Sequence, residues 1–198
     1  MAFSPYKPYR WASGWLSPVY CDNRLVLGFP KWRTQINDGL ISMVQEDFPE
    51  ATAVAGVATA GIPQASLLAH RLSWPMAYVR SSAKAHGKQN QIEGYLPAGG
   101  PVVVVEDLLS TAGSSIRAVE ALRDAGHRVL GMLAIFTYGF DVAQEGLDAR
   151  GIHWNSLTHW EALMEAAREK GHLDPSQEAR LKAWRANPDT WSPEPTLR

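Results

Sequence analysis

The stretch that decides the fold is residues 102–115, which read Val102-Val103-Val104-Val105-Glu106-Asp107-Leu108-Leu109-Ser110-Thr111-Ala112-Gly113-Ser114-Ser115. Four consecutive valines favour a strand that is covered on both faces of a parallel sheet. Beyond the stretch, apolar residues recur at helical spacing from Ile116 to Ala125, and Gly126 is placed to end that helix. A strand, a loop of small and hydroxylated residues and a helix, in this order, predict one strand–helix unit of an α/β domain.

The rest of the chain repeats this alternation of strands and helices. Short apolar runs predict further buried strands, and helical spacing with proline or glycine at the ends predicts the helices between them. Short connections between alternating elements indicate a parallel sheet of the α/β class. We expect strands at 53–57, 76–79, 102–105, 130–136 and 152–156, helices at 32–48, 64–72, 116–125, 158–170 and from Asp174-Pro175 onward, and turns at 61–63 and 99–101.

The composition restricts the class of protein and the way it can bind an anion. The chain has 198 residues, 45% of them apolar and 20% charged, with a formal net charge of −1. Such a balance gives no global attraction to nucleic acid or to an anionic membrane, so an anionic ligand needs a local cluster of donors. We expect neither nucleic acid nor membrane as a partner.

The single cysteine, Cys21, excludes an intrachain disulfide and a CxxC metal site. Its isolation fits a reducing cytosol. No apolar stretch approaches the ~20 residues that span a bilayer, and residues 1–6 lack the apolar core of a signal peptide. We therefore expect a cytoplasmic protein.

The loop that follows the valine run has the chemistry of a phosphate site. The start of a helix offers unpaired N–H groups and partial positive charge, and small residues let a phosphate approach that backbone. The adjacent carboxylates of Glu106 and Asp107 could accept hydrogen bonds from sugar hydroxyls, and a bound divalent cation would relieve their repulsion. The alternative is that the Ser and Thr hydroxyls cap the helix while the two acids form a solvated strand end.

The same stretch resembles the phosphoribosyl pyrophosphate (PRPP) signature of type I phosphoribosyltransferases. The resemblance implies their α/β fold, a Rossmann-like parallel sheet flanked by helices with a small N-terminal hood. It also implies that Glu106 and Asp107 hold the ribose hydroxyls, that Asp107 takes part in catalysis, and that the following loop binds the 5′-phosphate. The PRPP-binding loop residues implied are Leu108, Leu109, Ser110, Thr111, Ala112, Gly113, Ser114 and Ser115.

Four further segments resemble motifs of the bacterial orotate phosphoribosyltransferases. They are Trp11–Arg24, Gly56–Pro63, Tyr78–Gly94 and Ala134–Phe140, in the family's order. The second implies that Thr59 and Ala60 bind PRPP at its pyrophosphate, although Gly56–Gly61 could simply make a tight strand–helix turn. Arg24 could pair with the orotate carboxylate, or could instead pair with Asp22. The orotate-binding residues implied are Ser13, Tyr20, Arg24, Ser114 and Tyr138.

Residues 81–91 contain no large apolar side chain, so we expect a mobile surface loop. Its basic residues could close over an anionic ligand and stabilise charge where pyrophosphate leaves; an ordinary solvated basic loop is the alternative. The resemblance implies that Arg80, Lys84, His86 and Lys88 bind PRPP and that Lys84 and His86 are catalytic. In relatives this loop reaches the neighbouring subunit's site, so the resemblance also implies a homodimer that shares the 81–91 loop.

Together the motifs imply transfer of the phosphoribosyl group of PRPP to orotate, on the route to UMP, with Mg²⁺ as cofactor. The metal would be carried by PRPP, with Glu106 and Asp107 nearby and no direct side-chain ligand. The expected organisation is a partial N-terminal hood and base-site segment at 1–30, an α/β PRPP-binding core at 31–157 and C-terminal helices at 158–198. Ala12, Ala60 and Ser81 depart from the family, because many members have lysine there. A phosphoribosyltransferase for another base and a non-catalytic PRPP-sensing regulator remain alternatives.

Overall fold

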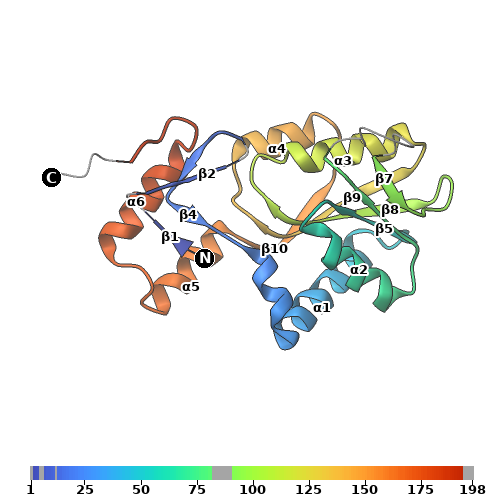
Figure 1. Ribbon diagram of the computed structural model, residues 1–198, viewed down its shortest axis with the longest axis horizontal. Helices are drawn as coiled ribbons and strands as arrows, with labels where there is room; N and C mark the ends of the chain where they lie inside the picture. The colour runs from blue at the N-terminus through green and yellow to red at the C-terminus, as the bar shows by residue number, and fades with distance from the viewer. Residues whose placement is uncertain (1, 5–6, 12, 82–90, 194–198) are drawn as a thin grey trace. The chain divides into compact units, whose positions relative to one another are not determined.

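The computed structural model describes residues 2–4, 7–11, 13–81 and 91–193. The chain forms two compact units, one made of Asn23–Trp160 and the other of Met1–Asp22 together with Glu161–Arg198 (Figure 1). The three-part division expected from the sequence stays a prediction. In the described ranges, no helix combines the length and the apolar character that a bilayer-spanning segment needs.

The larger unit is built on a six-stranded sheet. Neighbouring strands are parallel except at the β7 edge, where β7 runs antiparallel to β6. The α/β class and the parallel core of the sheet are confirmed, but the sheet is mixed. The antiparallel return needs no crossover helix, and residues 80–91 carry no helical pattern that could supply one. The strand order is β10 (Trp154–His159), β9 (Arg128–Thr137), β8 (Pro101–Leu109), β5 (Ala53–Val57), β6 (Met76–Val79) and β7 (Ile92–Gly94).

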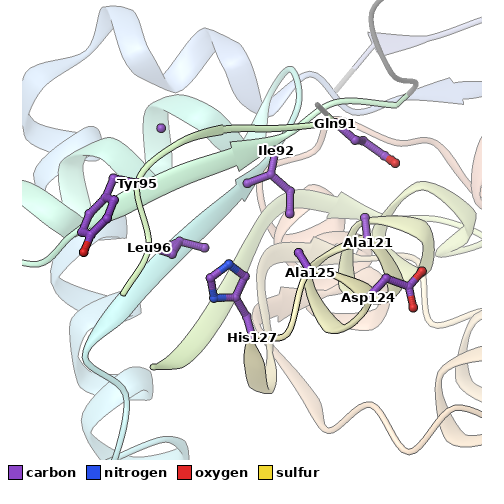
Figure 2. A pocket seen from close by; sticks show the side chains of 9 residues that line it. Gln91, Ile92, Tyr95, Leu96, Ala121, Asp124, Ala125 and His127 are labelled. Carbon is purple, nitrogen blue, oxygen red and sulfur yellow. The ribbon is translucent and has the colours of Figure 1, made fainter. Parts of the chain in front are cut away.

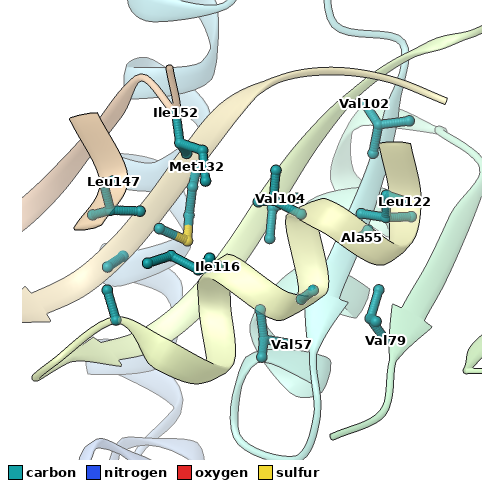
Figure 3. Close-up of a cluster of buried hydrophobic side chains, with 14 of the residues drawn as sticks. Ala55, Val57, Val79, Val102, Val104, Ile116, Leu122, Met132, Leu147 and Ile152 are labelled. Carbon is teal, nitrogen blue, oxygen red and sulfur yellow. The ribbon is translucent and has the colours of Figure 1, made fainter. Parts of the chain in front are cut away.

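Two pairs of helices cover the two faces of this sheet (Figure 1). Helices α1 (Pro30–Asp47) and α2 (Gly61–Leu72) pack on the face that carries Val103 and Val105. Helices α3 (Gly113–Asp124) and α4 (Asp141–Asp148) pack on the face that carries Val102 and Val104 (Figure 3). The period-2 alternation of a strand therefore sends the four valines into two separate cores, which explains why the run contains no polar residue.

Three elements differ from expectation in ways that matter for the site. Strand β8 continues to Leu109, so Glu106 and Asp107 lie within the strand and not at its end. Helix α2 begins at Gly61, where a turn was predicted. Pro63 is compatible with that start because an N–H in the first turn of a helix has no intrahelical partner to lose. Helix α4 was not predicted; it spans only Asp141–Asp148.

The smaller unit joins the two ends of the chain. Two antiparallel pairs of short strands, β1 (Ala2–Phe3) with β4 (Val19–Tyr20) and β2 (Tyr9–Arg10) with β3 (Leu16–Ser17), accompany α5 (Trp160–Glu169) and α6 (Pro175–Ala186). Trp184 of α6 is fully buried, and its Nε1 donates a hydrogen bond to the Leu16 carbonyl at 3.0 Å. The Trp11 ring meets Trp184 edge-on at 5.6 Å between centroids. One indole thus connects the C-terminal helix to the N-terminal strands.

The amino end of α6 is closed by its own side chains. The Asp174 carboxylate accepts a hydrogen bond from the Gln177 amide at 2.8 Å, and the Gln177 side chain accepts one from the Asp174 amide at 2.9 Å. Pro175 occupies the first helical position. This reciprocal capping box satisfies two amides that the helix itself cannot pair, and it confirms the predicted helix start at Asp174-Pro175.

Candidate active site

The junction between β8 and α3 leaves the amino end of α3 uncapped. Ala112 at the N-cap position has φ +58°, in the left-handed region, and no side chain makes a capping hydrogen bond there. Helix α3 then begins directly at Gly113, where the first intrahelical bond runs from the Ile116 amide to the Ala112 carbonyl at 2.9 Å. The structure therefore contradicts the alternative in which Ser or Thr hydroxyls cap this helix. The first-turn amides of α3 are available for an anion.

The neighbouring strand holds this loop in place. The Tyr138 amide, just beyond β9, donates a hydrogen bond to the Leu109 carbonyl with an N···O distance of 3.0 Å, which is typical of a backbone hydrogen bond. The Thr137 hydroxyl approaches the same carbonyl at 3.5 Å and accepts a bond from the Gly139 amide at 3.0 Å. The end of β8 is therefore tied to the end of β9 immediately before the loop reverses into α3.

The two adjacent acids have different environments. Glu106 is 5% exposed, and its carboxylate accepts hydrogen bonds from the Ser115 hydroxyl at 3.1 Å and from the Asp107 amide at 3.0 Å. Burial, with the neighbouring Asp107 charge as the second cause, raises the pKa of the Glu106 carboxyl well above its usual value. Asp107 is partly exposed. The pair therefore combines an inward acid that resists ionisation with an acid that solvent can reach.

Asn23 supports the accessible acid from a distant part of the chain. Its Nδ2 donates to the Asp107 carbonyl at 2.8 Å across a separation of 84 residues. Asn23 opens the 3₁₀ helix Asn23–Gly28. No role was predicted for Asn23, although it lies inside the Trp11–Arg24 segment that resembles a motif of the family. A polar residue within a recognised motif was the available signal, but its partner could not be known without the fold.

A second uncapped helix start lies at the same edge of the sheet. The turn Ala58–Ala60 links β5 to α2, and no side chain caps α2 at Ala60. A side chain at Gly61 would collide with the Val105 carbonyl and crowd the Glu106 backbone, so glycine lets α2 begin directly against β8. Thr59 and Ala60 thus lie where the adjacent parallel strands β5 and β8 both deliver their loops. Two helix starts without a side-chain cap therefore follow neighbouring strands, an arrangement compatible with a ligand that has two phosphate groups.

The basic loop is described only at its two ends. The Arg80 amide donates to the Gln91 carbonyl at 2.9 Å, and the Gln91 side chain donates to the Arg80 carbonyl at 2.9 Å. The Arg80 guanidinium lies 3.8 Å from a Glu93 carboxylate oxygen, and its buried Nη1 has no hydrogen-bond partner among the described residues. Lys84, His86 and Lys88 lie outside the described residues, so their assignments stay predictions.

The residues predicted for orotate are spread over both units. Ser13 and Tyr20 belong to the smaller unit, while Arg24 is exposed on the 3₁₀ helix of the larger one. Tyr138 is 1% exposed, with its ring stacked on Phe140 at 5.6 Å and edge-on to Phe136 at 5.0 Å. These environments leave the orotate contacts as predictions, and they give the Tyr138 ring a packing role as well.

The donor set fits a metal that arrives with its ligand. Among the described residues, no group of three or more His, Cys, Asp or Glu side chains is arranged to hold a metal ion. Mg²⁺ commonly binds through one or two carboxylates while phosphate oxygens and waters complete its shell. Asp107 supplies one partly exposed carboxylate beside the two uncapped helix starts, which is compatible with a Mg²⁺ ion that arrives with a phosphate ligand.

The chain is similar to proteins of known activity over most of its length. Residues 33–159 match the model of the family described as "Phosphoribosyl transferase domain". The chain is 51% identical over 187 residues to the orotate phosphoribosyltransferase of Listeria innocua serovar 6a, covering 94% of this chain and 90% of that protein. Among solved structures, it resembles orotate phosphoribosyltransferase from Aeropyrum pernix with a TM-score of 0.73 and 35% identity, over 84% of this chain and 92% of that one. It also resembles the Mycobacterium tuberculosis H37Rv orotate phosphoribosyltransferase in complex with PRPP, with a TM-score of 0.59 and 26% identity over 72% of this chain and 82% of that one.

Proposed function

We propose, from the premise that the chain belongs to the phosphoribosyl transferase domain family, that it is an orotate phosphoribosyltransferase of de novo pyrimidine biosynthesis. It transfers the phosphoribosyl group of PRPP to orotate, giving orotidine 5′-monophosphate and pyrophosphate. The observation that carries the proposal is the position of Asp107 on β8, directly before the uncapped amino end of α3. That geometry supports a sugar-binding acid next to a phosphate site, and the names of the relatives support orotate as the base.

The 5′-phosphate of PRPP binds at the start of α3. The first-turn amides of Gly113, Ser114 and Ser115 and the hydroxyls of Ser110 and Thr111 are the donors. Ala112, in its left-handed conformation, brings these donors together. A phosphate there gains charge-assisted hydrogen bonds and the favourable end of the helix dipole.

The ribose hydroxyls bind at the acidic pair. Asp107 accepts from them directly, since its carboxylate is the more accessible of the two. Glu106 is already engaged by Ser115 and by the Asp107 amide, so it acts mainly by fixing the turn of β8 into the loop. The raised pKa of Glu106 lowers the charge repulsion that two adjacent carboxylates would otherwise create beside a phosphate.

The pyrophosphate of PRPP binds at the β5–α2 turn through Thr59 and Ala60 and through the Gly61 amide, since the Ile62 amide donates to the Thr59 carbonyl at 3.3 Å and Pro63 has no N–H. Mg²⁺ would neutralise the pyrophosphate and orient it for departure, with Asp107 the described carboxylate best placed to reach it. Arg80 borders this region at the end of β6. Lys84, His86 and Lys88 add positive charge where the leaving group develops negative charge.

The reaction is a displacement at C1′ of the ribose. N1 of orotate forms the new C–N bond and gives up its proton to the departing pyrophosphate or to water, while the bond from C1′ to the pyrophosphate oxygen breaks and its electron pair leaves with pyrophosphate. The ribose carries oxocarbenium character in between, which the Asp107 carboxylate stabilises. No covalent enzyme intermediate is needed, so catalysis comes from positioning and charge stabilisation.

The remaining assignments complete the proposal. Ser13, Tyr20, Arg24, Ser114 and Tyr138 bind orotate, and Lys84 and His86 act with Asp107 in catalysis. A homodimer shares the 81–91 loop between subunits, and the protein works in the cytoplasm. The small residues Ala60 and Ser81, where many relatives have lysine, leave more of the pyrophosphate charge to Mg²⁺ and to Arg80.

The test is orotate consumption, followed at its ultraviolet absorption band with PRPP and Mg²⁺ present and then with each omitted. Loss of absorbance that requires both, with stoichiometric pyrophosphate release, is the expected result. A panel of uracil, adenine, guanine and hypoxanthine serves as the control for the base. Turnover of one of these in preference to orotate overturns the orotate assignment, and PRPP binding without turnover of any base overturns the enzymatic one.

A further inference from the structure

A groove of about 550 Å³ lies between the edge strand β7 and the carboxyl-terminal half of α3, next to the Gln91 end of the basic loop (Figure 2). Its volume falls in the range of sites that bind small molecules, about 300–1,000 Å³. A helix of the 12 residues in α3 is about 18 Å long at 1.5 Å per residue. The groove residues of α3, Ala121 and Asp124, therefore lie about 12–17 Å along the helix from its start at the phosphate loop.

The inner surface of the groove is apolar, with an aromatic ring at its border. Ile92 and Leu96 approach it from the β7 side, and Ala121 and Ala125 from α3 (Figure 2). Tyr95 is 71% exposed and is the most exposed large apolar side chain among the described residues. The two alanines leave the helix side flat, and an exposed ring beside a flat apolar surface favours a flat ligand that can stack.

The polar groups of the groove accept hydrogen bonds. The Asp124 carboxylate lies at its border and has no ion pair among the described residues. The Gln91 side chain already uses its NH₂ group on the Arg80 carbonyl, which leaves its oxygen to face a ligand donor. Nδ1 of His127 is buried without a hydrogen-bond partner in the described part of the chain. Because nothing holds that nitrogen, the imidazole ring can turn to offer it to a ligand without losing a bond.

The negative charge at the carboxyl end of α3 opposes binding of the anionic substrates PRPP and orotate. Carbonyl groups at the carboxyl end of a helix carry partial negative charge, and Asp124 adds a full one. A phosphate or a carboxylate placed here meets repulsion from both, whereas the amino end of α3 attracts them. The groove is therefore not a second site for PRPP, orotate or a nucleotide product.

We propose that this groove is a second ligand site, selective for flat aromatic molecules that are neutral or cationic and carry a hydrogen-bond-donating nitrogen. An exocyclic amine or an amidine on a ring has this chemistry. The ring lies on Ala121 and Ala125 beside Tyr95, while its N–H groups face Asp124 and Gln91. The proposal does not rest on the reaction at the other end of α3.

Benzamidine is the probe, because it is flat, cationic and rich in donors. Titration of the full chain, followed by backbone amide NMR shifts, is expected to move the signals of residues 92–96 and 121–127. Benzyl alcohol is expected to bind several-fold more weakly at the same place, and benzoate not at all. Shifts confined to other residues, or benzoate binding equal to that of benzamidine, overturn the proposal.

Two pairs of variants separate the groove from general surface binding. Ala125→Phe fills the groove at the C-cap of α3, and Ala149→Phe makes the same change at the exposed C-cap of α4. The first is expected to weaken benzamidine binding at least tenfold, and the second to leave it unchanged. If Ala125→Phe binds benzamidine with the same affinity as the wild type, the proposed site is wrong. The site is also wrong if the wild type does not bind benzamidine because a second copy of the chain covers the groove.

The charge preference has its own matched pair. Asp124→Asn, at the last residue of α3, is expected to weaken benzamidine binding about two- to fivefold, as for an exposed ion pair, while benzyl alcohol binding stays the same. Asp148→Asn, at the last residue of α4, is the control and is expected to change neither affinity. A loss of affinity in Asp124→Asn that is equal for the two probes means that the carboxylate does not select charge.

Discussion

The amino ends of α3 and α6 are built in opposite ways. Each helix has 12 residues and a serine at its second position, Ser114 in α3 and Ser176 in α6. Helix α6 starts behind a complete capping box of Asp174 and Gln177. Helix α3 starts behind Ala112 in a left-handed conformation, with no side-chain cap. One helix satisfies its first amides internally, and the other leaves them open.

The difference shows how a structural helix end and a ligand-binding one can be told apart. A missing cap costs about 1 kcal/mol, and a left-handed alanine adds strain of roughly 1 kcal/mol. A fold accepts both costs at one helix end when an anion completes that end in the working state. The acid before α6 is therefore a cap, whereas we propose that Asp107, before α3, serves the ligand through its side chain.

Among the substitutions that test this comparison, Asp107→Asn has the largest expected effect. If Asp107 holds the ribose hydroxyls, loss of its charge weakens two charge-assisted hydrogen bonds of about 1.5–3 kcal/mol each. We expect kcat/KM for PRPP to fall by about 10²- to 10⁴-fold, while the free energy of unfolding changes by less than about 1 kcal/mol. Steady-state kinetics and urea unfolding measure the two quantities. A variant with normal kcat/KM, or one that loses activity only because it unfolds, contradicts the role.

The next effect comes from placing a carboxylate at the second position of each helix. Ser114→Asp puts negative charge where the 5′-phosphate binds, and we expect KM for PRPP to rise about 10- to 100-fold, a repulsion of roughly 1.4–2.7 kcal/mol. Ser176→Asp is the matched control in α6 and is expected to leave KM unchanged. Equal effects of the two substitutions on KM would remove the distinction between the helix ends.

Glu106→Gln tests the buried acid behind α3. Because burial and Asp107 raise its folded-state pKa, Glu106 contributes stability fully below its unfolded pKa of about 4.5, and that contribution is lost as pH rises through the raised folded pKa. Glutamine stays neutral; its single side-chain oxygen can accept from the Asp107 amide, and its NH₂ group can donate to the Ser115 hydroxyl oxygen. We expect the stability of the variant to fall less than that of the wild type as pH rises above about 4.5. Parallel curves of urea midpoint against pH contradict this expectation.

Much of the fold is readable from the sequence because its signals are local. The valine run, the stripe from Ile116 to Ala125 and the Asp174-Pro175 start each depend on a few neighbouring residues, and the structure confirms all three. What the sequence did not predict depends on distant partners. The three-residue strand β7 exists because β6 offers it an edge, and the eight-residue helix α4 exists because Ala143 and Leu147 pack against the sheet.

In the candidate site, too, the features set by neighbouring residues were predicted and those set by distant contacts were not. The acidic pair and the loop after it are contiguous, so their residue types alone predicted a phosphate and sugar site. The bond from Asn23 to the Asp107 carbonyl joins residues 84 positions apart, and the inward orientation of Glu106 depends on Ser115 one turn into α3. Neither has a local signature, because a hydrogen bond between distant segments is fixed by the fold and not by spacing.

Asp174→Ala tests the capped end. Its side chain satisfies the Gln177 amide, so its removal is expected to lower the free energy of unfolding by about 0.5–2 kcal/mol. Activity at saturating substrate is expected to stay within about twofold, because a cap acts on α6 alone. Thermal unfolding and kcat are the measurements. Asp107→Asn is expected to show the opposite result, a loss of activity with little change in stability. A large fall in kcat with an unchanged melting temperature would mean that the α6 end also serves the ligand.

The smallest effect concerns Glu178, in the first turn of α6. Hydrogen bonds from Arg168 and then from Lys182 lower the pKa of its carboxyl from 4.5 to about 2. A depressed folded-state pKa gives stability that is present above the unfolded value and is lost as pH falls from about 4.5 toward about 2. Glu178→Gln is therefore expected to flatten the acid limb of the stability curve in that window and to leave kcat at neutral pH unchanged. Because the partner side chains Arg168 and Lys182 are 56% and 69% exposed, solvent screening keeps the effect small, and added salt should reduce it further. Carbon-detected NMR titration of the Glu178 carboxyl measures the pKa directly, and a value near 4.5 would show that the ion pairs with Arg168 and Lys182 do not persist in solution.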